Sequence, residues 1–133
     1  MKRAVLADTG PLYAAVDPDD AHHERAHQEL QRLAGDKREV LVAHPILLEA
    51  HTLVLFRLGK AASSRWLTDL AQGATLINPT PEDYHQAVAR TLSFSDQPIT
   101  LFDSVVAVLA ARLDVEVWTY DHHFDLMRIP VWR

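Results

Sequence analysis

Apolar and polar residues alternate along the chain in a pattern typical of strands followed by helices. Short apolar runs bounded by turn residues predict β-strands at residues 4–8, 40–43, 74–77 and 115–119. Between these runs, apolar residues recur at helical spacing, which predicts helices at residues 11–16, 45–58, 60–72, 81–93 and 101–113. A further helix is expected to start in the acidic segment 17–20 and to run to residue 34.

Proline and glycine residues mark the expected helix ends. Pro11 suits the first position of a helix, and Asp17 or Asp20 is expected to cap the next one. Gly35, Gly59 and Gly73 follow apolar helical segments and are expected to end them. Residues 129–132 are expected to form a last edge strand, because Pro130 cannot donate a hydrogen bond to a neighbouring strand.

Strands that alternate with helices predict an α/β domain with a central, mainly parallel sheet of about five short strands flanked by helices. The 133 residues suffice for one domain with a substantial core, and we expect this domain to span residues 1–133. The helix at residues 101–113 is apolar nearly all round, which predicts a buried central element.

Composition narrows the compartment and the possible chemistry. The chain has no cysteine, which excludes disulfides, thiolate metal sites and cysteine nucleophiles and fits a reducing cytoplasm. The apolar segment after Met1 stops at Asp8, too early for a signal peptide, and no run approaches the ~18 apolar residues of a membrane span. We therefore expect a cytoplasmic protein without membrane contact.

The formal net charge of −5, with 18 acids against 13 lysines and arginines, argues against a protein that coats DNA by charge. It does not exclude a nuclease, because bound metal ions supply positive charge where a phosphate lies.

Four acids occupy unusual places in this pattern. Asp8 and Asp121 directly follow predicted strands, while Glu49 and Asp103 interrupt apolar helices. In an α/β sheet, ligands bind beyond the carboxyl ends of the strands, so Asp8 and Asp121 would meet there if their strands are neighbours. Oxygen ligands select Mg²⁺ or Mn²⁺. Such a set predicts metal-dependent hydrolysis of phosphodiesters.

Each acid alone also has a structural interpretation. Glu49 could form a salt bridge at a helix edge, and Asp103 could complete a capping box with Thr100. Asp8 could be a turn or cap residue, and Asp121 could form an Asx-turn. Only the set of four indicates a functional site.

The histidines suggest a rival metal site. His23 and His27 lie four residues apart on one predicted helix, but the residues between them do not form an HExxH motif, and we interpret both as helix surface. His122 and His123 adjoin Asp121 and could contact a substrate.

Four segments of the chain, taken in order, resemble the PIN-domain family, specifically the VapC-like ribonuclease toxins of toxin–antitoxin pairs. The segments are residues 5–12, 47–50, 101–107 and 118–124. Each motif is short, but the ordered set is specific and covers essentially the whole chain.

The resemblance implies a Mg²⁺-dependent endoribonuclease in which Mn²⁺ can substitute, with Asp8, Glu49, Asp103 and Asp121 as the catalytic, metal-binding acids. Thr9 and Thr119 match positions where the family often has a supporting hydroxyl. The implied reaction is hydrolysis of RNA by a metal-activated water, leaving 5′-phosphate and 3′-hydroxyl ends.

The resemblance also implies two protein partners, a small antitoxin and a second copy of the chain. The apolar segments 53–56 and 66–67 are consistent with such contacts or with ordinary core packing. A single-strand groove needs cations along the backbone, and the expected substrate-binding residues are Arg57, Lys60, Arg65 and His122.

Two other functions remain as alternatives. One is a catalytically silent nucleic-acid or protein-binding module with the same fold, which the presence of all four acids disfavours. The other is a phosphatase with Asp8 as nucleophile, similar to the haloacid-dehalogenase-like enzymes. Their DxDx[TV] motif needs an acid where this chain has Gly10, so this alternative fails.

Overall fold

Parallel strands form the central sheet of the computed structural model, which describes residues 3–133. Within that range the sheet has four strands in the order β3-β2-β1-β4. They are β1 (Ala4–Ala7), β2 (Glu39–Ala43), β3 (Thr75–Ile77) and β4 (Glu116–Trp118). Every pairing is parallel, so all carboxyl ends lie at one edge, and those of β1 and β4 are neighbours.

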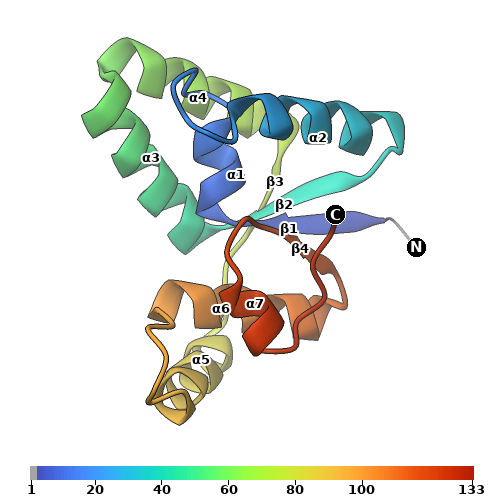
Figure 1. Cartoon of the computed structure of the whole chain (residues 1–133), viewed down its shortest axis with the longest axis vertical. Helices are drawn as coiled ribbons and strands as arrows, with labels where there is room; N and C mark the ends of the chain where they lie inside the picture. The colour runs from blue at the N-terminus through green and yellow to red at the C-terminus, as the bar shows by residue number, and fades with distance from the viewer. Residues whose placement is uncertain (1–2) are drawn as a thin grey trace.

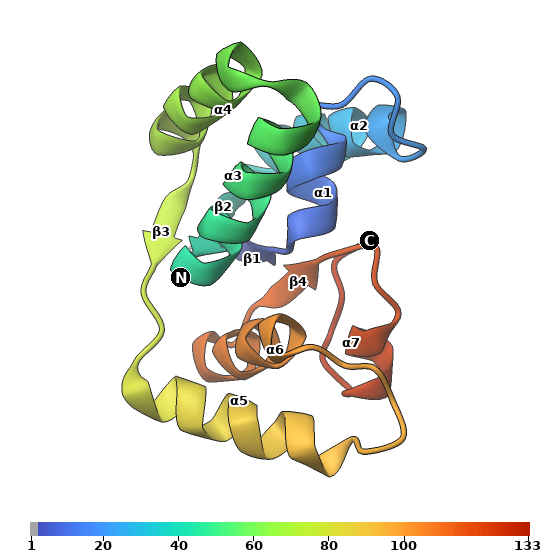
Figure 2. The same cartoon turned by 90° about the vertical axis from the view of Figure 1, so that its left-hand side faces the viewer.

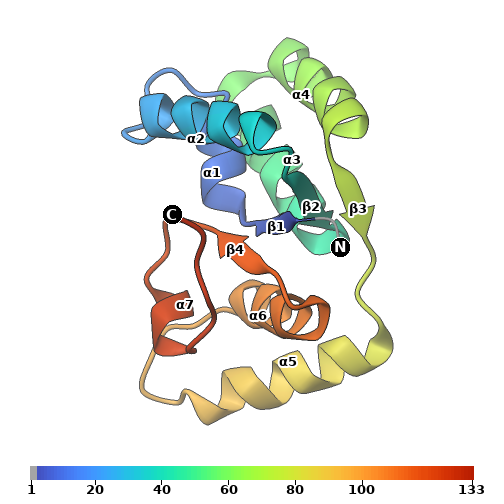
Figure 3. The same ribbon diagram turned by 90° about the vertical axis from the view of Figure 1, so that its right-hand side faces the viewer.

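Helices cover both faces of the sheet (Figure 1). On one side lie α1 (Thr9–Ala14), α2 (His23–Gly35), α3 (His44–Leu58) and α4 (Lys60–Gly73). On the other side lie α5 (Pro81–Ser93), α6 (Leu101–Leu113) and α7 (His123–Leu126). Figures 2 and 3 show that α5 packs against the outer side of α6, away from the sheet.

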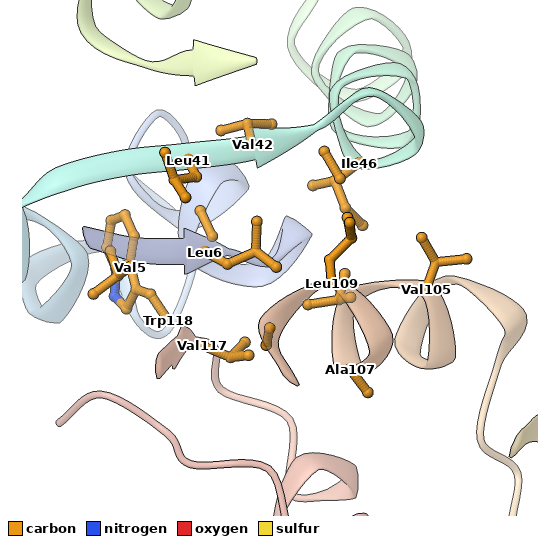
Figure 4. Close-up of a cluster of buried hydrophobic side chains, with 14 of the residues drawn as sticks. Val5, Leu6, Leu41, Val42, Ile46, Val105, Ala107, Leu109, Val117 and Trp118 are labelled. Atoms are coloured by element: carbon orange, nitrogen blue, oxygen red, sulfur yellow. The ribbon is translucent and has the colours of Figure 1, made fainter. Parts of the chain in front are cut away.

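The core forms where the apolar strands meet the apolar helices. Val5, Leu6 and Ala7 of β1 are fully buried, and so is most of α6. In Figure 4 the side chains of β1 lie between those of β2 and β4, and Leu109 of α6 packs in the same cluster. Burial on both faces explains why the strands are continuous apolar runs rather than alternating ones. The predicted α/β class and parallel sheet are confirmed.

The second helix starts later than predicted. Helix α2 begins at His23, and the acids before it stabilise turns instead of capping the helix. Asp17 accepts a hydrogen bond from the backbone N–H of Asp19 at 2.9 Å, and Asp20 accepts one from that of His22 at 2.8 Å. An aspartate side chain accepts a hydrogen bond from the backbone N–H two residues later in a turn as readily as it caps a helix. The sequence therefore looks the same in both cases.

The expected last strand is reduced to one bridge. Val131 pairs with Val117 in parallel, and the backbone N–H of Trp132 donates to the Val117 carbonyl at 2.9 Å. The four-residue helix α7 was not predicted, because it is too short to show a periodicity.

Glycine is required at the α3–α4 junction, where Gly59 has a φ of 93°. No helix in residues 3–133 combines the length and apolar character that crossing a membrane needs.

An ion pair between a buried carboxylate and a half-exposed guanidinium joins α5 to α6. Asp83 of α5 is 2% exposed and accepts hydrogen bonds from Nε and Nη2 of Arg112 on α6, at 2.8 and 2.7 Å. The Arg112 guanidinium lowers the pKa of Asp83 below its ordinary value. This paired geometry fixes α5 on α6, and α6 carries Asp103.

We predict that Arg112→Met lowers the free energy of unfolding by about 2 kcal/mol, because it leaves the buried Asp83 carboxylate without its cation. A lowered folded-state pKa contributes stability above pH 4, which is lost as the pH falls. The difference between the two proteins should therefore shrink below about pH 4, as measured by urea denaturation. The exposed control Arg65→Met should change stability by less than about 0.5 kcal/mol. A variant as stable as wild type at pH 7 would contradict the prediction.

Candidate metal centre

A cavity of about 520 Å³ opens at the carboxyl edge of the sheet, where β1 and β4 end. It contains all four acids singled out in the sequence. Its lining residues are Asp8, Thr9, Gly10, Glu49, Thr100, Phe102, Asp103, Tyr120, Asp121, His122 and His123. Residues up to 115 positions apart in the chain thus share one concave surface, which is typical of a functional site.

Asp8 is the most deeply held of the acids. It directly follows β1 and caps α1, so the regular elements on either side fix its backbone. Its Oδ1 accepts a hydrogen bond from the Thr9 backbone N–H at 2.9 Å, and its Oδ2 accepts one from the Thr119 hydroxyl at 2.8 Å. Burial, with a smaller contribution from the charges of Asp103 and Asp121, raises the pKa of Asp8 to about 6 despite these bonds.

Thr119 links the ends of the two neighbouring strands. It is 4% exposed, and its hydroxyl donates to Asp8 while accepting from the backbone N–H of Asp121 at 3.0 Å. Asp121 in turn accepts from the backbone N–H of His123 at 2.9 Å, the Asx-turn expected as its structural alternative. The turn directs Asp121 without removing it from the cavity.

Asp103 also combines both of its interpretations. It completes the capping box at the start of α6, where its Oδ2 accepts from the Thr100 backbone N–H at 3.2 Å. It is 7% exposed and lines the cavity. One carboxylate oxygen from each of Asp8, Asp103 and Asp121 lies within 4.8 Å of the others, close enough to share a metal ion.

Glu49 reaches the same cavity from α3. It is half-buried, and the Thr9 hydroxyl donates a hydrogen bond to its Oε1. Its carboxylate lies outside the group of three that are mutually within 4.8 Å. Thr9 and Thr119 therefore each hold one acid in place.

His123, which the sequence analysis named as a neighbour of Asp121 that could contact a substrate, lines the cavity. Its imidazole is 13% exposed, and its Nδ1 lies 3.1 Å from Asp103 and 3.3 Å from Asp121. The only sequence signal was its position two residues after Asp121. Of the other histidine pair, His27 is exposed as expected, whereas His23 is half-buried; their rings bond the carbonyls of Ala15 and Ala14 at the end of α1.

Carboxylates dominate the charge of the cavity. Among the described residues, none of those that line it is a lysine or an arginine. Like charges held this close destabilise one another unless a cation compensates them. Asp8, Asp103 and Asp121 offer carboxylate oxygens, His122 and His123 add imidazole nitrogens beside Asp121, and no thiolate exists in the chain. The three clustered carboxylates fit a hard divalent cation such as Mg²⁺ or Mn²⁺.

The expected substrate-binding residues divide into two groups. His122 lies at the rim of the cavity, with its side chain 76% exposed. Arg57, Lys60 and Arg65 lie outside the cavity lining, at the far end of α3 and on α4. The Arg57 guanidinium sits over the Tyr13 ring, 5.1 Å from its centre.

A fifth acid, Glu29 of α2, is buried beside β4 and was not predicted. It is 5% exposed and accepts hydrogen bonds from Trp118 Nε1 at 3.1 Å and from the Tyr120 hydroxyl at 2.5 Å. Burial, and then this bond to Glu29, raises the pKa of Tyr120 above its ordinary value, so the phenol remains a donor. Glu29 thus fixes the residue that immediately precedes Asp121.

Comparison with known proteins identifies one family. The model of the PIN domain matches residues 5–129. No curated protein matches the chain.

Several solved structures share the fold at low sequence identity. The Mycobacterium tuberculosis VapC20, a sarcin–ricin loop cleaving toxin, superposes with a TM-score of 0.83 at 20% identity, over 97% of this chain and 98% of that one. VapBC2 from Rickettsia felis, bound to a DNA fragment from its promoter, gives 0.76 at 15% identity, over 98% and 97%. FitAcB from Neisseria gonorrhoeae gives 0.69 at 19% identity, over 97% and 96%.

We predict that Asp8→Asn removes a pH-dependent loss of stability from the metal-free protein. Because the folded-state pKa of Asp8 is raised to about 6, the folded wild type loses stability as the pH rises from 4 to 6. A shift of this size corresponds to roughly 3 kcal/mol at neutral pH. The variant should therefore match wild type near pH 4 and exceed it at pH 7, in urea denaturation with EDTA present.

The control for this experiment is Asp96→Asn, which removes an exposed acid from the loop between α5 and α6. It should not reproduce the effect. A stability difference between Asp8→Asn and wild type that stays constant from pH 4 to pH 7 would count against the site.

Proposed function

Because the chain belongs to the PIN domain family, we propose that it is a Mg²⁺- or Mn²⁺-dependent endoribonuclease and the toxin of a toxin–antitoxin pair. The observation that carries the proposal is the convergence of Asp8, Asp103 and Asp121, with Glu49 beside them, in a cavity that contributes no lysine or arginine in the described part of the chain. Such a carboxylate set suits a metal-assisted reaction on a phosphate, and the PIN match makes a nuclease the natural interpretation.

Asp8, Asp103 and Asp121 would hold the metal. A bound divalent cation supplies positive charge at the phosphate and lowers the pKa of a nearby water. The residues around the acids keep them in position: Thr119 orients Asp8, and the capping box of α6 orients Asp103.

Glu49 is placed to move a proton. Thr9 holds its Oε1, so Oε2 is the oxygen that can accept a proton from the attacking water. The water oxygen bonds to phosphorus, the bond from phosphorus to the 3′ oxygen breaks, and that oxygen takes up a proton from solvent, which balances the proton that Glu49 takes from the water. The products are a 5′-phosphate and a 3′-hydroxyl.

RNA is the proposed substrate, and exposed loops are the preferred targets, because unstacked bases are accessible to a protein. The similar VapC20 is described as a toxin that cleaves the sarcin–ricin loop. His122 at the rim would contact the substrate near the cleaved bond, while Arg57, Lys60 and Arg65 would contact only outlying parts of a longer RNA.

The proposed protein partners are a small antitoxin and a second copy of the chain. Several apolar side chains remain available for such contacts. Phe56 and Leu48 on α3 are 81% and 67% exposed, and Leu92 on α5 is 74% exposed. Within the segments singled out by sequence, Val54 and Trp66 are instead part of the core.

We predict that the purified protein cleaves single-stranded or loop RNA in Mg²⁺ or Mn²⁺ and stops when EDTA is added. Asp8→Asn should lower the cleavage rate by at least about 100-fold, because it removes a charge that the metal needs. Mass spectrometry of the products should find 5′-phosphate ends. Activity that persists in EDTA, or 2′,3′-cyclic phosphate ends, would exclude this mechanism, and metal binding without cleavage would favour the silent module.

We also predict that Mn²⁺ stabilises the wild type against heat by mass action on the folded state. At a concentration 100 times the dissociation constant, the gain is about 2.7 kcal/mol. Asp8→Asn should gain much less, whereas Asp125→Asn should respond like wild type, because Asp125 does not line the cavity. Equal responses of wild type and Asp8→Asn in melting curves would remove Asp8 from the metal site.

A further inference from the structure

A second cavity of about 190 Å³ adjoins the metal centre and contains the cations that the first one lacks. Tyr120, Asp121 and His122 line both cavities and form their common wall. Arg25 of α2 and Arg133 line the second cavity only, together with Thr119, Asp125 and Val131. An RNA strand bound at the acids can therefore continue past His122 into the second cavity, which is more positive than the first.

The two arginines are not equally available to a ligand. Arg133 is paired with Asp125, with its Nη2 lying 3.4 and 3.2 Å from the two carboxylate oxygens. Arg25 makes its contacts with Nε, which lies 3.5 Å from Glu29, and with the face of its guanidinium, which lies 4.3 Å from the centre of the Tyr120 ring. These contacts leave its two terminal nitrogens to bind an anion.

Arg25 is also held in a fixed position. Its side chain is 47% exposed, yet it is stacked on Tyr120 and tethered to the buried Glu29. Glu29 itself takes hydrogen bonds from Trp118 and Tyr120 and lies outside the lining of either cavity. A guanidinium that is already ordered loses little conformational freedom when it binds an anion.

We infer that Arg25 forms a phosphate subsite for RNA, which binds a backbone phosphate next to the one cleaved at the metal centre. The inference rests on the proposed function, since it assigns a second contact to the same substrate. Two acids, Asp121 and Asp125, also line this cavity, and the negative charge of each is compensated locally. Asp125 pairs with Arg133, and Asp121 belongs to the proposed metal centre. Phosphate contacts of this kind fix the register of a strand without reading its sequence.

The test compares Arg25→Gln with Arg32→Gln, a closely matched control. Arg32 lies on the same helix, stacks on Trp132 at 4.5 Å and donates to the backbone carbonyl of Arg133 at 2.9 Å, but its own side chain lines neither cavity. Binding of a labelled single-stranded RNA is measured in the Asp8→Asn background, so that the RNA stays intact, and KM is measured in the active protein. Arg25→Lys and thermal melting of each variant separate a lost contact from a lost fold.

We expect Arg25→Gln to weaken RNA binding about tenfold and to reduce the slope of log K against log salt by about one, with a larger effect on KM than on kcat. Arg32→Gln should leave the binding constant and the slope as in the parent protein. Arg25→Lys should retain the salt slope and bind with intermediate affinity, because it keeps the charge but not the stacked guanidinium.

RNAs shortened from the 5′ side or the 3′ side of the cleavage position locate the contact. Shortening from one side should weaken binding to the parent protein but not to Arg25→Gln, because the phosphate it removes is the one Arg25 binds. The subsite would be overturned if Arg25→Gln and Arg32→Gln changed the RNA-binding constant equally. It would also be overturned if shortening the RNA weakened binding equally in the parent protein and in Arg25→Gln. Absence of cleavage by wild type would count against the proposed function, while the binding measurements would still decide the role of Arg25.

Discussion

The carboxylates of Asp8, Asp103 and Asp121 repel one another, and the fold nevertheless holds an oxygen of each within 4.8 Å of the others. Strand ends, a helix terminus and threonine hydroxyls hold these acids in place against the repulsion. Adjacent parallel strands place the ends of β1 and β4 side by side, and the N-terminus of α6 adds the third acid. Hydroxyls of threonine then fix two of the acids, Thr119 on Asp8 and Thr9 on Glu49. A site built this way is unfavourable without a cation, which is the property that lets it bind one.

Three buried acids show how the chain distinguishes a structural carboxylate from a functional one. Asp83 is neutralised by Arg112, which lowers its pKa and ties α5 to α6. Glu29 is surrounded by donors from Trp118 and Tyr120 and by Nε of Arg25. Asp8 has two donors but no cation, and its pKa is raised. All three are buried, and what distinguishes Asp8 is the missing counter-charge, a property that favours a functional role.

The strands, most helices and the position of the acids could be predicted from the sequence because each depends on local periodicity or on strand ends. The start of α2 could not, since Asp17 and Asp20 carry the same signal in a turn as in a helix cap. Glu29 was missed for a different reason. Its partners, Trp118 and Tyr120, lie about 90 residues away and meet it only through packing of α2 beside β4. The position of His123 depends on the Asx-turn at Asp121, which binds its backbone N–H, and on the contact of its imidazole with Asp103.

The sequence also could not show which basic residues lie near the acids, because that too depends on packing between distant segments. Arg57 lies on the helix that carries Glu49, and Lys60 and Arg65 follow on the next helix. Along the axis of α3, however, Arg57 is about 12 Å from Glu49. Charges in solvent are screened over about 8 Å at physiological ionic strength, so a cation beyond that range does little for a phosphate at the acids. Arg25 is far from Asp121 in the chain, and yet both residues line the second cavity. An overall charge of −5 is therefore compatible with binding a polyanion, because the placement of a few cations beside the acids matters more than their total.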